Sequence, residues 1–385
     1  MGIDYAWFLW VTKSASSPLV SLRRRSDHSS TMVVTEGFVP VSADRLTAAR
    51  RVFVLGATGT IGRATVRALL RRGHEVVCFV RNRAPTNKTG ASAVTPAAVD
   101  GQTTRDPLAG ADVRRGDVCD PVSLARDGFR GEKFDAVVSC MASRNGAPAD
   151  AWAIDYQAHV NVLTAAQAAG VSHLVLLSAI CVQKPLLAFQ RAKLAFEAQL
   201  IASGMTYSIV RPTAFFKSLS GQVERLKQGK PFLVFGDGML TACKPISDGD
   251  LGDYLAACLS DMALHNRVLP IGGPGPAITP RQQGEGLFAL LGKKPRFKQV
   301  PVALLDVIVV VLSNLGRLVP SLAAKAELAR IGRYYATESM LVLDPLTGRY
   351  DADATPSTGT VTLLDHYAAL VKGAAVTERG DHAVF

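Results

Sequence analysis

The stretch that most constrains this chain is Arg51 to Gly62, RVFVLGATGTIG. Its apolar residues Val52 to Leu55 predict a short buried strand, and a helical pattern begins directly after the glycines. Gly56, Gly59 and Gly62 follow the spacing G-x-x-G-x-x-G. In a dinucleotide-binding turn the first glycine allows the tight turn, the second lets the backbone approach a pyrophosphate, and the third lets the helix pack on the strand. A glycine pattern alone also fits an ordinary tight turn, but the flanking strand and helix favour a dinucleotide cofactor.

The phosphates of that cofactor are expected on the free N–H groups at the start of the helix, where the helix dipole favours negative charge. The residues of the turn predicted to bind the cofactor are Gly56, Thr58, Gly59, Thr60, Ile61 and Gly62.

Arg81 indicates which dinucleotide is bound. It follows a second apolar strand, Glu75 to Val80, about twenty residues after the glycine turn. NAD-binding proteins usually carry an acidic residue there for the ribose 2′-hydroxyl, whereas an arginine accommodates a 2′-phosphate. Arg81 therefore predicts NADPH, although a solvated arginine at a strand end would look the same.

Strands and helices alternate from Arg51 onward, which is typical of a parallel sheet with helices on both faces. We expect an α/β fold with a doubly wound, Rossmann-type parallel sheet from Val52 to Ile271. Residues 49–271 would form the NADPH-binding domain, and residues 272–385 a smaller C-terminal substrate-binding region that the excursion 215–245 joins.

Two segments stand apart from this pattern. Residues 1–48 are rich in Ser and Thr and carry the basic cluster Arg23 to Arg25, so they are either a disordered extension or an organelle transit peptide. Residues 84–108 are rich in Ala, Thr, Pro and Gly and predict a surface insertion.

Composition narrows the class of ligand. The formal charge is +11, but the basic residues are scattered without an aromatic-interleaved stripe, which favours anionic ligands or an anionic membrane surface over nucleic acid. The six cysteines include no C-x-x-C pair, so we expect buried thiols in a reducing compartment, with neither a metal site nor disulfides.

Asp117 ends the predicted third strand and has two interpretations. A strand-end aspartate in such folds commonly faces the adenine of the cofactor, and it would also serve as a cap for a helix beginning near Pro121.

The chemistry depends on the helix after the fifth strand. That strand ends in Ser178, and the helix reads Phe189-Gln190-Arg191-Ala192-Lys193. The frame resembles the short-chain dehydrogenase/reductase superfamily, in its atypical or extended form, where a serine is followed by Y-x-x-x-K. Tyrosine and lysine then share one helical face, and the tyrosine protonates a carbonyl oxygen. Here Lys193 is present to hold the nicotinamide ribose, but phenylalanine replaces the tyrosine.

A phenyl ring cannot donate a proton, so ordinary ketone reduction is not expected. The chain either binds NADPH without turnover, as a sensor would, or transfers hydride to a substrate without an oxygen to protonate, such as a conjugated C=C bond. Pro212, in the turn after the sixth strand, is predicted to wall the nicotinamide pocket, and Phe215 and Phe216 either face a flat ligand or belong to the core.

Five longer runs resemble the NADPH-dependent divinyl chlorophyllide 8-vinyl-reductase family of phototrophs. The runs are SAICVQKPLLAFQRAKLAFE (Ser178 to Glu197), YSIVRPTAFFKSLSGQVE (Tyr207 to Glu224), FGDGMLTACKPIS (Phe235 to Ser247), VLPIGGPG (Val268 to Gly275) and IGRYYATESMLVLDP (Ile331 to Pro345). The resemblance implies reduction of the 8-vinyl group of 3,8-divinyl chlorophyllide a, or of its protochlorophyllide, to ethyl. The alternatives are an isoflavone-reductase-like enzyme for another conjugated substrate and a non-catalytic NADPH sensor or assembly factor.

The same resemblance guides the choice of site residues. Lys193 is the expected catalytic residue, with Ser178 and Tyr334 as further candidates, and Cys181, Tyr335 or solvent as other proton donors. The resemblance also implies a tetrapyrrole partner and either a plastid or, in a bacterium, the cytoplasm. The basic residues proposed to reach the substrate's carboxylate are Lys217, Lys244 and Arg333.

Val302 to Val319 is strongly apolar but interrupted by Asp306, Asn314 and Arg317. The interruptions argue against a membrane span. We expect a helix that packs over the pocket or in the core, or else a helix that lies in a membrane interface as a peripheral contact.

Overall fold

The computed structural model describes residues 48–82, 106, 108–144, 146–317 and 319–373. The predicted tail and nearly all of the predicted insertion 84–108 lie outside these residues.

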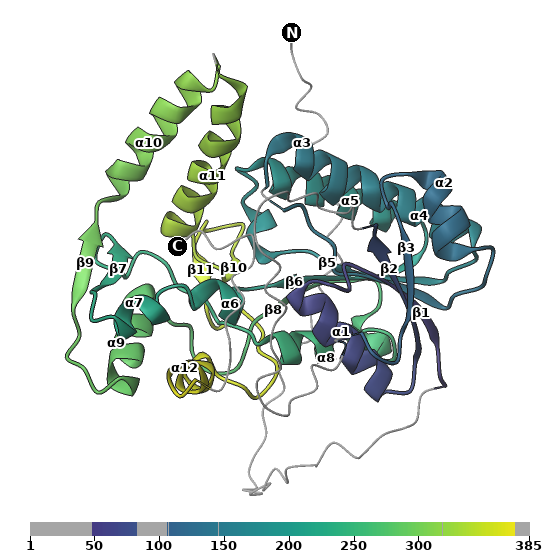
Figure 1. Cartoon of the computed structure of the whole chain (residues 1–385), viewed down its shortest axis with the longest axis horizontal. Helices are drawn as coiled ribbons and strands as arrows, with labels where there is room; N and C mark the ends of the chain where they lie inside the picture. The colour runs from purple at the N-terminus through teal and green to yellow at the C-terminus, as the bar shows by residue number, and fades with distance from the viewer. Residues whose placement is uncertain (1–47, 83–105, 107, 145, 318, 374–385) are drawn as a thin grey trace, which may run out of the picture. The chain divides into compact units, whose positions relative to one another are not determined.

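A seven-stranded sheet in the order β3-β2-β1-β4-β5-β6-β8 forms the centre of the described chain, and every neighbouring pair in it is parallel. This confirms the predicted doubly wound, Rossmann-type sheet (Figure 1). The central strands β1, β2, β4 and β5 are almost wholly buried because helices cover both faces, which explains their continuous apolar runs, whereas the edge strand β3 is mostly exposed and polar. The strands are β1 (Arg51–Leu55), β2 (Glu75–Arg81), β3 (Asp112–Gly116), β4 (Ala136–Ser139), β5 (His173–Leu177), β6 (Thr206–Pro212) and β8 (Arg267–Ile271).

Two apolar clusters hold the helices on the two faces of this sheet. On one face, residues of α1 and α8 pack with β1 and β2 around Val54 and Leu255. On the other face, η2, α4 and α5 pack around Phe53, whose ring stacks on that of Phe129 at 4.3 Å between centroids. The helices of this part are α1 (Thr60–Arg71), α2 (Pro121–Ser123), η2 (Leu124–Phe129), α3 (Pro148–Ala151), η3 (Trp152–Ala158), α4 (His159–Ala168), η4 (Ile180–Gln183), α5 (Ala188–Ala202), α8 (Asp248–Ala257) and η5 (Met262–Leu264).

The chain order reverses at β1, which has β2 on one side and β4 on the other. Open α/β sheets bind ligands at such a switch point, outside the carboxyl ends of the strands. Gly56 makes the turn there with φ of +71°, and a Cβ on it would lie 2.6 Å from the carbonyl of Cys140 after β4. A Cβ on Gly62 would lie 2.1 Å from the Gly56 carbonyl oxygen, so both positions require glycine.

A third apolar cluster joins the excursion after β6 to the C-terminal part of the chain. Strand β7 pairs in parallel with β9, and Phe216, Leu226, Phe288 and Tyr367 share one apolar core. The elements here are α6 (Phe216–Leu219), α7 (Val223–Lys227), β7 (Phe232–Phe235), α9 (Pro280–Leu290), β9 (Phe297–Val300), α11 (Pro320–Thr337), β10 (Val342–Leu343), β11 (Tyr350–Asp351) and α12 (Leu363–Val371).

The apolar segment predicted after Val302 forms α10 (Val302–Leu315), which makes a hairpin with α11 (Figure 1). None of the residues of α10 is buried, so the expectation of a core helix was wrong. The helix meets its neighbour α11 along one side, and its other side is exposed. Among the described residues, every helix is too short or too polar to cross a membrane.

Candidate functional site

A cavity of about 840 Å³ opens at the carboxyl ends of β1, β4, β5 and β6 and extends toward α11. It brings together most of the residues that the sequence predicted for the site. Those that line it are Gly56, Thr58, Gly59, Thr60, Ile61, Gly62, Arg81, Ser178, Lys193 and Pro212. Several other predicted residues, among them Asp117, Cys181 and Tyr334, are absent from its lining.

The glycine turn forms one end of the cavity. The Gly59 N–H donates to the Gly56 carbonyl at 3.0 Å, and α1 begins at the next residue. In the described chain no side chain caps this helix, so its first N–H groups are open to an anion. Lys217, from the excursion after β6, donates to the Thr60 hydroxyl at 3.2 Å and adds a positive charge at this end.

Arg81 is the last residue of β2, beside the glycine turn at the switch point. Its side chain is exposed and lines the cavity, and no ion pair engages it among the described residues. This position fits the predicted contact with a 2′-phosphate.

Asp117 does not take the predicted role of helix cap in the described chain. One carboxylate oxygen accepts from the Cys119 N–H at 2.9 Å, which fixes the turn after β3. The helix that follows is capped instead by Asp120, which accepts from the Val122 N–H at 3.0 Å. Its neighbours Gly116 and Val118 line the cavity, so a contact between Asp117 and the adenine stays a prediction.

Lys193 lies in α5 with only 8% of its surface exposed. Its ammonium forms an ion pair of 3.1 Å with Asp155 in η3, and Asp155 also accepts from the Ser143 N–H at 3.2 Å. The second carboxylate oxygen of Asp155 is buried and has no partner among the described residues. The sequence analysis missed Asp155, whose one signal was an acidic residue inside an apolar helical pattern.

Ser178 belongs to a second buried network. Its hydroxyl donates to Glu197, and Glu197 also accepts from the Arg211 guanidinium. Glu197 is 2% exposed, so the pair with Arg211 neutralises a charge that would otherwise be costly to bury. Ser178 therefore lines the cavity, but its hydroxyl already donates its proton to Glu197. The sequence analysis did not predict Glu197 as a partner of Ser178.

The aromatic residues divide between the cavity and the core. Phe189, one helical turn before Lys193, lines the cavity at the tyrosine position of the Y-x-x-x-K pattern that the sequence resembles. Phe215 lines it as well, whereas Phe216 is buried in the cluster around Tyr367. The flat-ligand interpretation thus fits Phe215, and the core interpretation fits Phe216.

The two tyrosines of α11 point to different surroundings. The Tyr334 hydroxyl donates to the Cys181 carbonyl at 2.9 Å, away from the cavity lining, which argues against Tyr334 as the proton donor. Tyr335 lines the cavity instead. Burial raises the pKa of Tyr335 well above its usual range, so its hydroxyl keeps its proton at neutral pH.

Of the three basic residues proposed to bind a substrate carboxylate, only one reaches the cavity. Lys217 lines the cavity at the glycine turn. Lys244 donates to the Thr355 carbonyl at 2.8 Å, and Arg333 pairs with Asp306 of α10. Lys244 and Arg333 are therefore structural in this arrangement, because neither reaches the cavity.

Comparison with known proteins agrees with this geometry. A family described as NAD(P)H-binding matches residues 56–262. The divinyl chlorophyllide a 8-vinyl-reductase, chloroplastic, of Zea mays is 49% identical over 340 residues, covering 87% of this chain and 82% of the maize protein. The protein of the same name from Arabidopsis thaliana is 49% identical over 341 residues, covering 86% and 79%.

The chain belongs to the divinyl chlorophyllide a 8-vinyl-reductase family. The resemblance inferred from the five sequence runs is thereby confirmed. Among solved structures, the NADPH complex of the quinone oxidoreductase QOR2 from Escherichia coli has the same fold. Its TM-score is 0.57 at 19% identity, covering 83% of this chain and 99% of that one.

In this member of the 8-vinyl-reductase family, we expect Asp155→Asn to lower the free energy of unfolding by about 3 kcal/mol, because it leaves the buried Lys193 ammonium without a counter-charge. Urea unfolding measures the effect. The double variant Asp155→Asn/Lys193→Met should recover most of the loss. A double variant no more stable than the single one would contradict the pairing.

A matched control is the exposed pair of Arg281 and Glu285, 3.1 Å apart on α9. Glu285→Gln should change the free energy of unfolding by less than about 1 kcal/mol, because solvent screens exposed pairs.

Proposed function

We propose that this chain uses NADPH to reduce the 8-vinyl group of a divinyl chlorophyllide to an ethyl group. The main observation behind the proposal is that Phe189, one helical turn from Lys193, lines the cavity in place of a tyrosine. The scaffold of a reductase is kept while the usual proton donor to a carbonyl oxygen is missing. A vinyl group conjugated to a macrocycle is an acceptor that has no oxygen to protonate, and the maize and Arabidopsis relatives are named for this substrate.

The residues at the glycine turn fit NADPH. The turn lines the cavity from Gly56 to Gly62, and the uncapped start of α1 suits the pyrophosphate. Lys217 is positioned to neutralise a phosphate there rather than to bind a substrate carboxylate, and Arg81 suits the 2′-phosphate.

The carboxylate oxygen of Asp155 that lacks a hydrogen-bond partner supports NADPH binding at the nicotinamide end of the cavity. It needs a hydrogen-bond donor beside Lys193, and a ribose hydroxyl is such a donor. We assign Lys193 and Asp155 to hold the nicotinamide ribose. When bound, NADPH supplies the hydride for the reduction.

The remaining cavity suits a flat apolar substrate. Phe189, Phe215, Leu328 and Ile331 contribute aromatic and aliphatic walls, as pockets for apolar ligands usually have. Once hydride is added to one vinyl carbon, the electron pair of the double bond passes to the other carbon and into the macrocycle. That carbon must then take a proton.

We assign Tyr335 to supply this proton. In the described chain it is the one tyrosine that lines the cavity, and its hydroxyl is protonated at neutral pH. The proton passes to the vinyl carbon, and solvent returns a proton to the phenolate, so the residue ends each cycle unchanged.

The plant relatives are named as chloroplastic proteins, and we infer the same compartment for this chain. A plastid would also supply the pigment that the proposed reaction consumes.

Incubation of the purified protein with NADPH and divinyl chlorophyllide a should convert the pigment to its monovinyl form. Chromatographic retention and the Soret band follow the conversion, and a reaction without NADPH is the control. Tight NADPH binding with no monovinyl product would favour a non-catalytic NADPH-binding protein and sink the proposal.

Arg81→Ala should weaken NADPH binding by roughly 10- to 100-fold, because a charge-assisted contact with the 2′-phosphate is lost. NADH binding should change by less than about three-fold, because NADH has no such phosphate. Fluorescence titration measures both. Arg115→Ala removes an exposed arginine on β3 outside the cavity lining and should affect neither cofactor. Equal losses for both cofactors in Arg81→Ala would refute the role of Arg81.

Tyr335→Phe should lower kcat by about 100-fold, since it removes the proposed general acid while keeping the ring. Tyr334→Phe is the matched control from the same helix, because its hydroxyl bonds to the Cys181 carbonyl outside the cavity lining. The control should lose stability but keep its turnover. A Tyr335→Phe protein with wild-type kcat would assign proton donation to solvent.

A further inference from the structure

The exposed side of α10 is apolar except at Asn314, near the end of the helix. Five of its side chains share one helical face at positions i, i+3, i+4, i+7 and i+11, and we call them the outer face. Between 37% and 58% of each side chain is exposed. The outer face consists of Leu304, Val307, Ile308, Val311 and Leu315.

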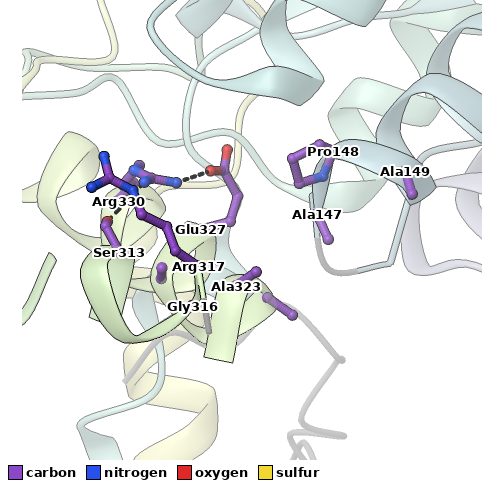
Figure 2. A pocket seen from close by; sticks show the side chains of 11 residues that line it. Ala147, Pro148, Ala149, Ser313, Gly316, Arg317, Ala323, Glu327 and Arg330 are labelled. Atoms are coloured by element: carbon purple, nitrogen blue, oxygen red, sulfur yellow. Dashed lines mark hydrogen bonds and ion pairs between the residues drawn. The ribbon is translucent and has the colours of Figure 1, made fainter. Parts of the chain in front are cut away.

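The inner side of the same helix carries two of its three polar residues, Asp306 and Ser313. Asp306 pairs with Arg333 of α11, and the Ser313 hydroxyl accepts from Arg330 of α11 at 2.8 Å. Arg330 also pairs with Glu327 at 2.8 Å, as Figure 2 shows beside a cavity of about 530 Å³. The hairpin is thus held partly by polar contacts, while apolar residues face outward.

This distribution is the reverse of that in a helix of a soluble protein, which turns its apolar stripe to the core. The outer face contributes nothing to the core, because no residue of α10 is buried. It also contributes nothing to the large cavity, whose nearest lining residues belong to β9 and α11. A contiguous apolar face of this kind indicates a contact outside the chain.

Basic residues accompany the outer face. Lys294, Arg296 and Lys298 are exposed in the segment that leads into α10, and Arg317 is exposed just after it. None of these four has an ion-pair partner among the described residues. Phe297 packs inward against Phe288, so Lys298, the next residue of β9, points to the opposite side.

We propose that the outer face of α10, with its flanking basic residues, docks this protein on an anionic lipid surface. An α-helix of 14 residues is about 21 Å long, shorter than the roughly 30 Å hydrocarbon core of a bilayer. The helix would therefore lie in the interface, with its aliphatic side chains among the acyl chains and its basic neighbours at the headgroups.

The chemistry of the face favours lipid over a protein partner. Its side chains are all aliphatic, whereas the centres of protein interfaces are enriched in aromatic residues and arginine. The cations lie at its margins, where lipid headgroups attract them, and the net charge of +11 adds a long-range attraction to an anionic surface.

Docking through α10 would place its partner α11 next to the membrane. Leu328, Ile331 and Tyr335 of α11 line the large cavity, so one wall of that cavity would lie close to the lipid. The docking itself requires no particular reaction in the cavity.

Co-sedimentation of the full chain with vesicles tests the proposal. Vesicles of equal parts phosphatidylglycerol and phosphatidylcholine should bind the protein, and pure phosphatidylcholine should bind it much more weakly. The variant Leu304→Gln/Ile308→Gln/Val311→Gln should lower partitioning by about 100-fold, since each apolar side chain loses its transfer into the lipid. Arg296→Gln/Lys298→Gln should lower it by about 25-fold, since each charge contributes about five-fold.

Matched controls remove similar groups elsewhere. Val122, Met262 and Leu346 are 65%, 82% and 94% exposed, and replacing all three with Gln should leave partitioning unchanged. Lys133→Gln/Lys372→Gln removes two exposed charges and should reduce partitioning by less than about three-fold. Helix content by circular dichroism should be preserved in the α10 variant, because Gln favours helix as much as the residues it replaces.

Three results would overturn the proposal. One is unchanged partitioning of the α10 variant. Another is loss of binding only when Arg23 to Arg25 are neutralised, which would assign docking to the N-terminal segment. The third is a lipid-free dimer that the α10 variant converts to monomer, which would assign the outer face to a second copy. The α10 variant should also keep vinyl reduction of detergent-dispersed pigment, so failure of docking and failure of the proposed function are distinguishable.

Discussion

The close approach of Gly56 to the Cys140 backbone underlies the site. It is possible because β1 lies between β2 and β4 in a parallel register, so the loops after β1 and β4 leave the sheet side by side. A side chain on Gly56 would push these loops apart, and a side chain on Gly62 would push α1 away from the turn. The position of the N–H groups at the start of α1 follows from both contacts, and the cavity follows from that position.

Two buried ion pairs organise the other side of the cavity. Lys193 with Asp155, and Arg211 with Glu197, place charged groups where burial would be unfavourable without a partner. The pairs hold α5 against η3 and β6, and they fix the lysine and the serine of a reductase frame beside a phenylalanine. In the proposed function, the phenylalanine removes the donor for carbonyl reduction, while the lysine still holds the cofactor.

The C-terminal part of the chain provides the wall of the cavity that faces away from the sheet. Helix α11 lines the cavity on one side, through Ile331 and Tyr335, and on another side Arg330 and Arg333 hold α10. Because those arginines bind Asp306 and Ser313 on the inner side of α10, the aliphatic residues of that helix are left facing outward. The substrate wall and the proposed lipid contact are therefore two consequences of one helix pair.

The sequence by itself predicted the parallel sheet, the glycine turn and the family. It also predicted the places of Arg81, Phe189 and Lys193 at the ends of strands or on one helical face. These features depend on strand periodicity and motif spacing, which are local properties of the chain. Tertiary structure decided which of several similar residues reach the cavity. Tyr335 lines it while Tyr334 bonds to a backbone carbonyl, and Lys217 lines it while Lys244 and Arg333 are engaged elsewhere. Tertiary structure also brought Asp155 to Lys193, 38 residues away in the chain, and Glu197 to Arg211, 14 residues away. It placed the aliphatic side of α10 on the surface. Adjacent or chemically equivalent residues carry the same local signal, so only the packing of distant elements distinguishes them.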